Sequence, residues 1–282
     1  MATHAGLEQA HFQNRLGRYR LAIATINVAL HDAQRCGERW AEGMGHVLWG
    51  ESLWRLGEYH EAQKKLNHAL TVAHALRQGR DRTVLIGWCH HHLGIIDDLQ
   101  GRFADALDHL EQACAAWQAI ENPQGLSGSL NSRGLVSYNM GDLRTAQQSM
   151  EQALALCEQL DDRFRQSSLL NNLSMLSTEQ GDYLRAHHYL QLGLTLAIRS
   201  GNLSSQAEIY SNLGKNYNLQ GKSDLAIENL ERGLKISESI GNRSLLAEMM
   251  IHLAEAKRKK DDAKHAEFLC NQALEIARKD NL

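Results

Sequence analysis

Proline is almost absent from this sequence. One proline occurs among 282 residues, against an average usage of about 5%. Proline is most disruptive inside a helix, where it removes a hydrogen-bond donor and clashes with the preceding turn. A chain that nearly excludes proline is therefore predicted to be helical from end to end.

Long apolar runs, paired cysteines and a surplus of positive charge are missing as well. No stretch approaches the ~18 consecutive apolar residues of a membrane-spanning helix, and no secretory signal is recognisable at the N-terminus. The five cysteines are scattered without a C-x-x-C pair, which indicates a reducing compartment and predicts a cytoplasmic protein. The 30 basic and 33 acidic residues argue against nucleic-acid binding, which needs a basic surplus.

What the sequence does contain is a repeat. A turn residue followed five positions later by alanine recurs at positions 17, 57, 101, 141, 181, 221 and 261. Successive positions differ by 40, except for one interval of 44, and the turn residue is glycine except for Asp261. A small residue stands seven positions before each turn residue, and another stands twelve positions after it. Fixed offsets repeated seven times indicate seven copies of one structural unit.

Each unit is predicted to be a pair of helices joined by a tight turn. Glycine accepts the left-handed backbone conformation that ends a helix. The segment after the turn is apolar at helical spacing, so a second helix is expected there. Small residues allow two helices to approach at the close end of the usual range of about 8–10 Å. Such a hairpin can bury its remaining apolar face only by stacking on neighbouring hairpins.

The frame small-x6-Gly-x4-Ala-x6-Ala resembles the tetratricopeptide repeat, most closely within 171–186 and 211–221. The resemblance covers nearly the whole chain and implies an all-α fold, a right-handed α-solenoid (superhelix) of about seven helix–turn–helix hairpins. The period of 40 is longer than the usual ~34 residues. This longer form resembles the repeats of kinesin light chains, of Pins-type adaptors and of sensor regions in bacterial transcription regulators.

We expect one solenoid domain over residues 1–282. Its repeats are expected at approximately 3–37, 41–80, 83–121, 124–161, 165–201, 204–241 and 244–280. The one longer interval places four additional residues within 72–84, as an added helical turn or a longer loop. Pro123 lies between the third and fourth repeats, where proline can open the next helix.

No catalytic or cofactor motif is present. The sequence contains no Gly-x-Ser-x-Gly, phosphate loop or His-Glu-x-x-His, so we expect neither enzymatic activity nor a cofactor. A metal-binding or enzymatic role through His91, His92 and Asp98 is an alternative, because Asp98 follows His91 by seven residues on the same predicted helix face. Ordinary polar lining of a groove is the competing interpretation.

The resemblance implies that the first helix of each hairpin lines a concave groove that binds a peptide. In the second unit the corresponding positions include Val47, Leu48, Glu51, Trp54 and Arg55. Over the whole chain, the predicted binding residues are Trp54, His91, His92, Asn131, Tyr138, Asn171, Asn172, Asn212 and Lys215.

Asparagines are the main polar side chains in the middle of this predicted groove. An asparagine side chain both donates and accepts hydrogen bonds, so it can hold a peptide backbone of any sequence. In kinesin-light-chain-like and Pins-like repeats, asparagines at matching positions bind an extended peptide, and the resemblance implies this role for Asn131, Asn171, Asn172 and Asn212. The alternative is that they satisfy polar groups of neighbouring helices. Trp54 likewise either anchors a ligand or packs on the next repeat.

The sequence therefore predicts a non-enzymatic interaction module that binds a peptide segment of a partner protein, without nucleic acid or membrane insertion. The alternative is a ligand- or peptide-sensing regulatory domain of a larger signalling or transcription regulator. Solenoids normally need polar capping units at their ends, and none is visible here. We therefore expect either a module of a larger protein or self-association through the solenoid ends.

Overall fold

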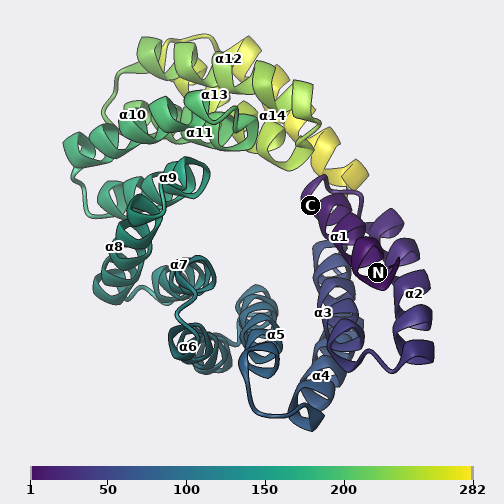
Figure 1. The fold of residues 1–282 in the computed structure, drawn as a ribbon. Coiled ribbons are helices and arrows are strands. Elements are labelled where there is room, and N and C mark those ends of the chain that lie inside the picture. Colours follow the sequence, from purple (N-terminus) through teal and green to yellow (C-terminus); the bar gives the residue numbers. More distant parts are fainter. Residues whose placement is uncertain (1, 281–282) are drawn as a thin grey trace. The chain divides into compact units, whose positions relative to one another are not determined.

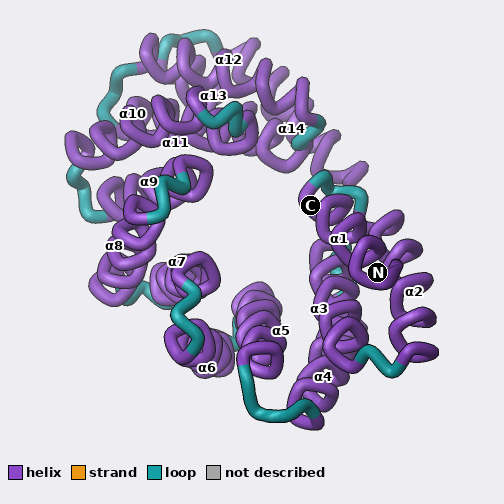
Figure 2. Tube along the Cα trace, in the orientation of Figure 1, coloured by secondary structure: helices purple, strands orange, loops and turns teal. Residues whose placement is uncertain are grey.

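The computed structural model describes residues 2–280, and all regular structure in that range is helical (Figures 1 and 2). Fourteen helices follow one another through short loops, and residues 2–280 contain no strand. The chain divides into two compact units, residues 1–149 and 150–282. The predicted all-α class is confirmed.

The first unit contains seven complete helices and the beginning of an eighth. They are α1 (Ala2–Arg15), α2 (Tyr19–Cys36), α3 (Arg39–Arg55), α4 (Tyr59–Ala75), α5 (Arg80–Leu99), α6 (Phe103–Ala119), α7 (Pro123–Asn139) and α8 (Leu143–Gln159), within which the boundary falls. Consecutive helices pack as the hairpins α1–α2, α3–α4 and α5–α6. The first helices α1, α3, α5 and α7 also contact one another in order, so the hairpins stack as predicted.

The second unit repeats this arrangement. After the end of α8 it contains α9 (Arg163–Glu179), α10 (Tyr183–Arg199), α11 (Leu203–Leu219), α12 (Ser223–Ile240), α13 (Arg243–Lys259) and α14 (Ala263–Asp280). The hairpins are α9–α10, α11–α12 and α13–α14, and the first helices α9, α11 and α13 contact in order. None of the helices in residues 2–280 combines the length and apolarity that crossing a bilayer would require.

Small residues lie where the two helices of a hairpin cross. A Cβ built on Gly214 would lie 2.3 Å from the Cγ of Leu230, and one built on Gly50 would lie 2.7 Å from the Cγ of Leu66. Both leucines belong to the second helix of the same hairpin and are fully buried. The second small position is equally enclosed, since Ala69 is 0% exposed. The predicted role of the small residues as crossing points is thus confirmed.

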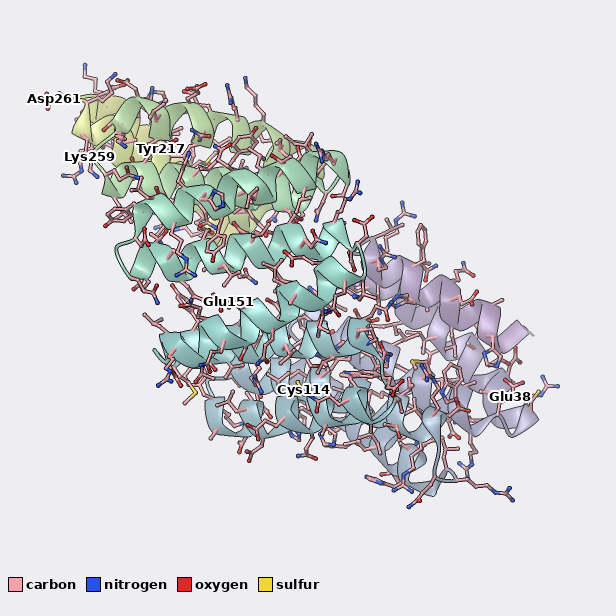
Figure 3. All side chains as sticks on the ribbon, turned by 60° about the vertical axis from the view of Figure 1, so that its left-hand side comes forward. Glu38, Cys114, Glu151, Tyr217, Lys259 and Asp261 are labelled. Carbon is pink, nitrogen blue, oxygen red and sulfur yellow. The ribbon has the colours of Figure 1, made fainter. Side chains whose placement is uncertain are left out.

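The predicted turn residues adopt the left-handed conformation. Gly57 and Gly221 have φ of 80° and 73°, and Asp261, labelled in Figure 3, has φ of 60°. A second series of left-handed residues lies between the hairpins and was not predicted. It includes the non-glycine residues Glu121 (φ 52°) and Asp161 (φ 50°). This conformation is unfavourable for a residue with a Cβ, because the Cβ approaches the following carbonyl oxygen.

Replacing Glu121 with glycine is expected to raise the free energy of unfolding by about 1 kcal/mol. The left-handed conformation costs an L-residue roughly 1–2 kcal/mol, and the greater freedom of glycine in the unfolded chain offsets only part of this gain. Urea denaturation followed by circular dichroism measures the change. Glu111, which is exposed within α6, is the control, since glycine there should cost about 1 kcal/mol. A lower urea midpoint for Glu121→Gly would contradict the assigned strain.

The four additional residues of the long interval are divided between a helix and a loop. Helix α5 has 20 residues where α7 has 17, and the preceding loop 76–79 is one residue longer than the loop 120–122 before α7. Pro123 is the first residue of α7, and the side chain of Asn122 accepts a hydrogen bond from the Gly125 backbone N–H at 3.0 Å. Proline opens the helix as predicted.

All five cysteines are free. Cys89, Cys114 (Figure 3) and Cys157 are buried, while Cys36 and Cys270 are exposed. Burial raises the pKa of the Cys89 thiol far above its usual value, so this side chain behaves as a small apolar group. The absence of a disulfide framework agrees with the scattered cysteine pattern.

Candidate functional site

The first helices of three successive hairpins enclose a cavity in the first unit. Helices α1, α3 and α5 lie in contact in this order, and a cavity of about 330 Å³ opens between them. Its lining is mainly apolar and aromatic, with contributions from Leu7, Trp40, Met44, Val47, Leu48 and Trp88. An apolar cavity with a few polar groups is the usual form of a ligand site.

Helical periodicity explains how one helix supplies so much of this lining. Residues 40, 44, 47, 48 and 51 of α3 all line the cavity, and their spacing of three and four places them on one helix face. Three of them, Val47, Leu48 and Glu51, occupy positions that the repeat pattern predicted for the groove. Trp40 and Met44 extend the same face toward the start of the helix and were not predicted.

Aromatic contacts fix the wall that α5 contributes. Trp88 stacks on His92 with ring centroids 5.7 Å apart and meets Trp117 edge-on at 5.3 Å. The indole N–H of Trp54 donates to Nδ1 of His92 at 3.3 Å. Two residues predicted for binding, Trp54 and His92, are therefore joined, although only His92 is among the cavity lining. On the opposite wall, His4 stacks on Trp40 at 5.5 Å.

His92 is held in the neutral form. It is 5% exposed, and burial lowers its pKa to about 3, with smaller contributions from Arg55 and His11. Because Nδ1 accepts the hydrogen bond from Trp54, the single ring proton is assigned to Nε2. The cavity thus carries no positive charge from His92 at neutral pH.

Two carboxylates give the cavity its charge. Glu8 is exposed, and Glu51 is half-buried and accepts a hydrogen bond from Asn14 Nδ2 at 3.2 Å. The guanidinium of Arg55, one turn beyond, lies instead over the ring of Trp54 at 4.2 Å. No lysine or arginine is among the lining side chains that the structure describes. The cavity is therefore apolar inside, and its polar lining consists of the two carboxylates and three histidines, His4, His11 and His92.

The asparagines of the predicted groove connect successive first helices. Nδ2 of Asn212 on α11 donates to Oδ1 of Asn171 on α9 at 2.8 Å, and Asn171 is only 4% exposed. In the same unit Asn216 donates to Oγ1 of Thr178 at 3.3 Å. These bonds are of the kind expected if the amides satisfy neighbouring helices. A peptide contact stays a prediction for Asn131, Asn171, Asn172 and Asn212.

The remaining predicted groove residues lie half-buried on first helices. Asn131 and Tyr138 are on α7, and Asn172 is on α9. Lys215 on α11 lies near Glu248 of α13, whose pKa is lowered chiefly by a hydrogen bond with His252 and further by the charge of Lys215. In the second unit the charge of this lysine therefore acts on a carboxylate of the neighbouring first helix.

His91, His92 and Asp98, the alternative metal ligands suggested by the sequence, each contact a different hydrogen-bond partner. Nδ1 of His91 lies 3.1 Å from Oγ of Ser129, whereas Nδ1 of His92 receives the Trp54 N–H. Oδ1 of Asp98 accepts a hydrogen bond from Asn139 at 3.0 Å. Within residues 3–279, one group of histidine, cysteine or acidic side chains has ligand atoms close enough together to hold an ion. That group does not include His91, His92 or Asp98.

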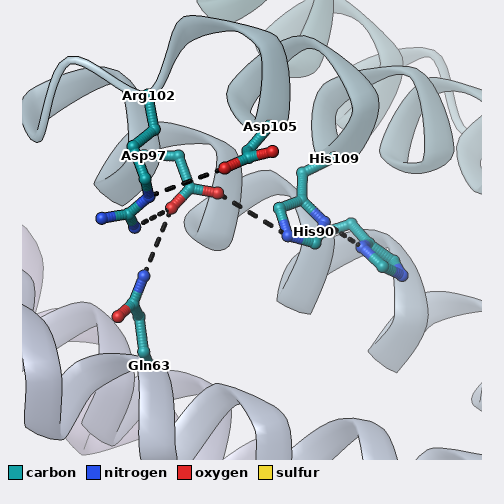
Figure 4. A network of polar contacts seen from close by, with 6 residues as sticks. All are labelled: Gln63, His90, Asp97, Arg102, Asp105 and His109. Carbon is teal, nitrogen blue, oxygen red and sulfur yellow. Dashed lines mark hydrogen bonds and ion pairs between the residues drawn. The ribbon is translucent and has the colours of Figure 1, made fainter.

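A buried carboxylate organises a second polar cluster (Figure 4). Asp97 on α5 is 3% exposed and accepts hydrogen bonds from Gln63 on α4, at 3.2 Å, and from Arg102. Nε2 of His109 on α6 lies 3.7 Å from the same carboxylate, and its Nδ1 lies 2.9 Å from Nδ1 of His90. The charge of Asp97 is thus compensated inside the protein, and the cluster ties α4, α5 and α6 together.

Comparison with known proteins identifies the family. A family model described as tetratricopeptide repeat matches residues 44–119, 126–199 and 205–279. The chain belongs to the tetratricopeptide repeat family. No curated protein matches the sequence.

Solved structures share the fold at low sequence identity. The apo form of RapI aligns with a TM-score of 0.76 and 14% identity, over 100% of this chain and 99% of that chain. The Rap conjugation gene regulator of plasmid pLS20, in complex with the Phr* peptide, aligns with a TM-score of 0.74 and 17% identity. The alignment covers 98% of this chain and 74% of that chain. A third structure is a Signal Transduction ATPase with Numerous Domains from Pyrococcus horikoshii, which has a tetratricopeptide repeat sensor. It aligns with a TM-score of 0.72 and 15% identity, over 96% of this chain and 41% of that chain. These identities establish the fold alone.

Proposed function

We propose that this tetratricopeptide repeat protein is a non-enzymatic module that binds a peptide segment of a partner protein, with one peptide side chain anchored in the α1–α3–α5 cavity. The observation that carries the proposal is the cavity itself. It is built by the first helices of three stacked hairpins and is lined by two tryptophans, apolar side chains, two carboxylates and three histidines.

The size and chemistry of the cavity favour a side chain over a larger ligand. Its volume of about 330 Å³ is at the lower end of the roughly 300–1,000 Å³ of small-molecule pockets. Aromatic walls provide large contact areas for an apolar or aromatic group. Glu8 and Glu51 then favour a neighbouring positive charge. The expected ligand is a peptide with an aromatic or long aliphatic anchor next to lysine or arginine.

The structural comparisons support a peptide ligand for this fold. One solved neighbour is a Rap regulator in complex with a peptide, and another carries a tetratricopeptide repeat sensor. The second of these favours an alternative in which the same cavity senses a ligand for a larger regulator. In both alternatives the repeats bind the ligand. The response to binding is then produced by another protein or by an attached domain.

Binding of a selected peptide is expected to depend on the cavity wall and on its charge. Peptides are selected by display panning against the wild-type protein, and their affinity is measured by isothermal titration calorimetry. Trp88→Ala should weaken binding about 30-fold or more, because truncation of an aromatic anchor typically costs about 2 kcal/mol. Glu8→Lys should weaken it by up to about tenfold, since the exposed charge contributes roughly 1 kcal/mol.

Glu111→Lys is the matched control for the charge reversal. Glu111 is exposed on the second helix α6 and does not line the cavity, so the substitution changes the net charge equally at another place. Circular dichroism verifies that each variant is folded. Equal affinities for the wild type, Trp88→Ala and Glu8→Lys would exclude the cavity as the binding site.

A further inference from the structure

A group of potential metal ligands lies within the second hairpin, on a different face of α3 from the cavity. Glu42 and His46 of α3 and His68 of α4 each offer one ligand atom, and these atoms all lie within 4.8 Å of one another. Glu42 and His46 are one helical turn apart. At about 100° per residue they lie roughly half a turn around α3 from the cavity-lining residues.

We infer that Glu42, His46 and His68 form a Zn²⁺ site that joins α3 to α4. Two imidazole nitrogens and one carboxylate oxygen are a ligand set that zinc commonly takes, with bonds of about 2.0–2.2 Å and a fourth position for water. Ligand atoms around such an ion are about 3.4 Å apart. The ligand atoms of the present group are up to 4.8 Å apart, so binding requires the exposed side chain of His68 to move inward.

His46 provides the second observation in favour of a ligand. This residue is 8% exposed, and its buried Nδ1 has no hydrogen-bond partner. A buried polar nitrogen without a partner is costly, and coordination of an ion through Nδ1 would provide the missing interaction.

The carboxylate of Glu42 is already oriented by its neighbours. Its Oε2 accepts a hydrogen bond from Arg39 at 3.1 Å, while Oε1 lies 4.0 Å from Nε2 of His68 and 3.5 Å from Nε2 of Gln34. One oxygen is thus held by a cation, and the other faces the histidine. Outer contacts of this kind fix a ligating carboxylate. The ring of His46 is also held in place, because it stacks on Trp49 with an interplanar angle of 5°.

Zinc titration of the metal-stripped protein at pH 7 tests the site. Isothermal titration calorimetry should show one equivalent of bound Zn²⁺, and the ion should raise the midpoint of thermal unfolding, because it binds only the folded chain. Glu42→Gln and His68→Gln should each weaken binding at least tenfold. They should also remove most of the thermal shift. Both replacements keep the side-chain size close to the original, and circular dichroism verifies that each variant is folded.

His60→Gln is the matched control, since His60 is also an exposed histidine of α4 but lies outside the group. It should bind Zn²⁺ as the wild type does. Substitution with Co²⁺ checks the ligand type, and a nitrogen and oxygen site shows no thiolate charge-transfer band. Failure to bind Zn²⁺, equal binding by Glu42→Gln and His68→Gln, or a thiolate band from cysteine would each overturn the inference.

Discussion

Acidification from pH 7 to pH 5 is expected to remove several kcal/mol of stability, a large fraction of the total for a typical domain. Burial lowers the pKa of His92 to about 3 and those of His46 and His90 to about 4. Neighbouring positive groups add to each shift. The three side chains are 5%, 8% and 9% exposed, and His92 is the most deeply buried, so solvent screens its shift least.

The sign follows from where the protons bind. Below the ordinary pKa of 6.5 the unfolded chain takes up protons on these rings, whereas the folded protein does so only near pH 3–4. The stabilisation is therefore complete above about pH 6.5 and is lost as the pH falls toward the folded pKa. At pH 5 His92 contributes a loss of about 2 kcal/mol, and His46 and His90, which solvent screens more, each contribute less.

Urea denaturation at pH 7 and pH 5, with a chelator present, measures this loss. In His92→Phe the difference in stability between the two pH values should shrink by about 2 kcal/mol, because one of the three proton-linked groups is removed. Leu93→Ala is the control. Leu93 is buried beside His92, so its truncation should lower stability equally at both pH values. An unchanged pH difference in His92→Phe would show that this ring is not buried in neutral form.

Replacing Gly214 with alanine is expected to destabilise the second unit by about 2 kcal/mol. The added Cβ would lie 2.3, 2.6 and 2.9 Å from three carbons of Leu230. These distances are shorter than van der Waals contact, so Leu230 or the helix backbone would have to move. Overpacking of this kind costs roughly 1–3 kcal/mol. It outweighs the gain of up to about 1 kcal/mol that alanine brings inside a helix. Urea denaturation followed by circular dichroism measures the net effect.

Gly128 provides the matched control because it also lies within a helix. A Cβ there would meet only Cε1 of His91, at 3.9 Å, so Gly128→Ala should be neutral or stabilising. Truncating Leu230 in the Gly214→Ala background should cost less than in the wild type, because it relieves the clash. If Gly214→Ala and Gly128→Ala were equally stable, the close crossing of α11 and α12 would not explain the glycine at position 214.

The sequence was sufficient to predict the hairpins because their determinants are local. Glycine at a left-handed turn and a small residue at a crossing both act within a single hairpin. The left-handed residues Glu121 and Asp161 were missed because they are not glycine. They nevertheless occupy the same place in successive repeats as the left-handed Gly201, and this regular recurrence was a usable signal.

The cavity was only partly predictable because three hairpins build it. The repeat pattern indicated Val47 and Glu51, and continuing their helical face by one and two turns would have added Met44 and Trp40. The contribution of α1 and the position of Trp88 depend on how α1, α3 and α5 pack. The bond between Asn171 and Asn212 depends in the same way on the stacking of two hairpins. A residue pattern gives the face of a helix but not the partner opposite it.

The most direct test of the central claim is photo-crosslinking with a peptide selected on the wild-type protein. A benzophenone group replaces the anchor side chain, and mass spectrometry locates the attachment. We expect attachment to the cavity lining of α1, α3 or α5, with Met44 the favoured acceptor. Attachment confined to the second helices α2 and α4, or to residues 150–282, would contradict the assignment of the cavity as the peptide site.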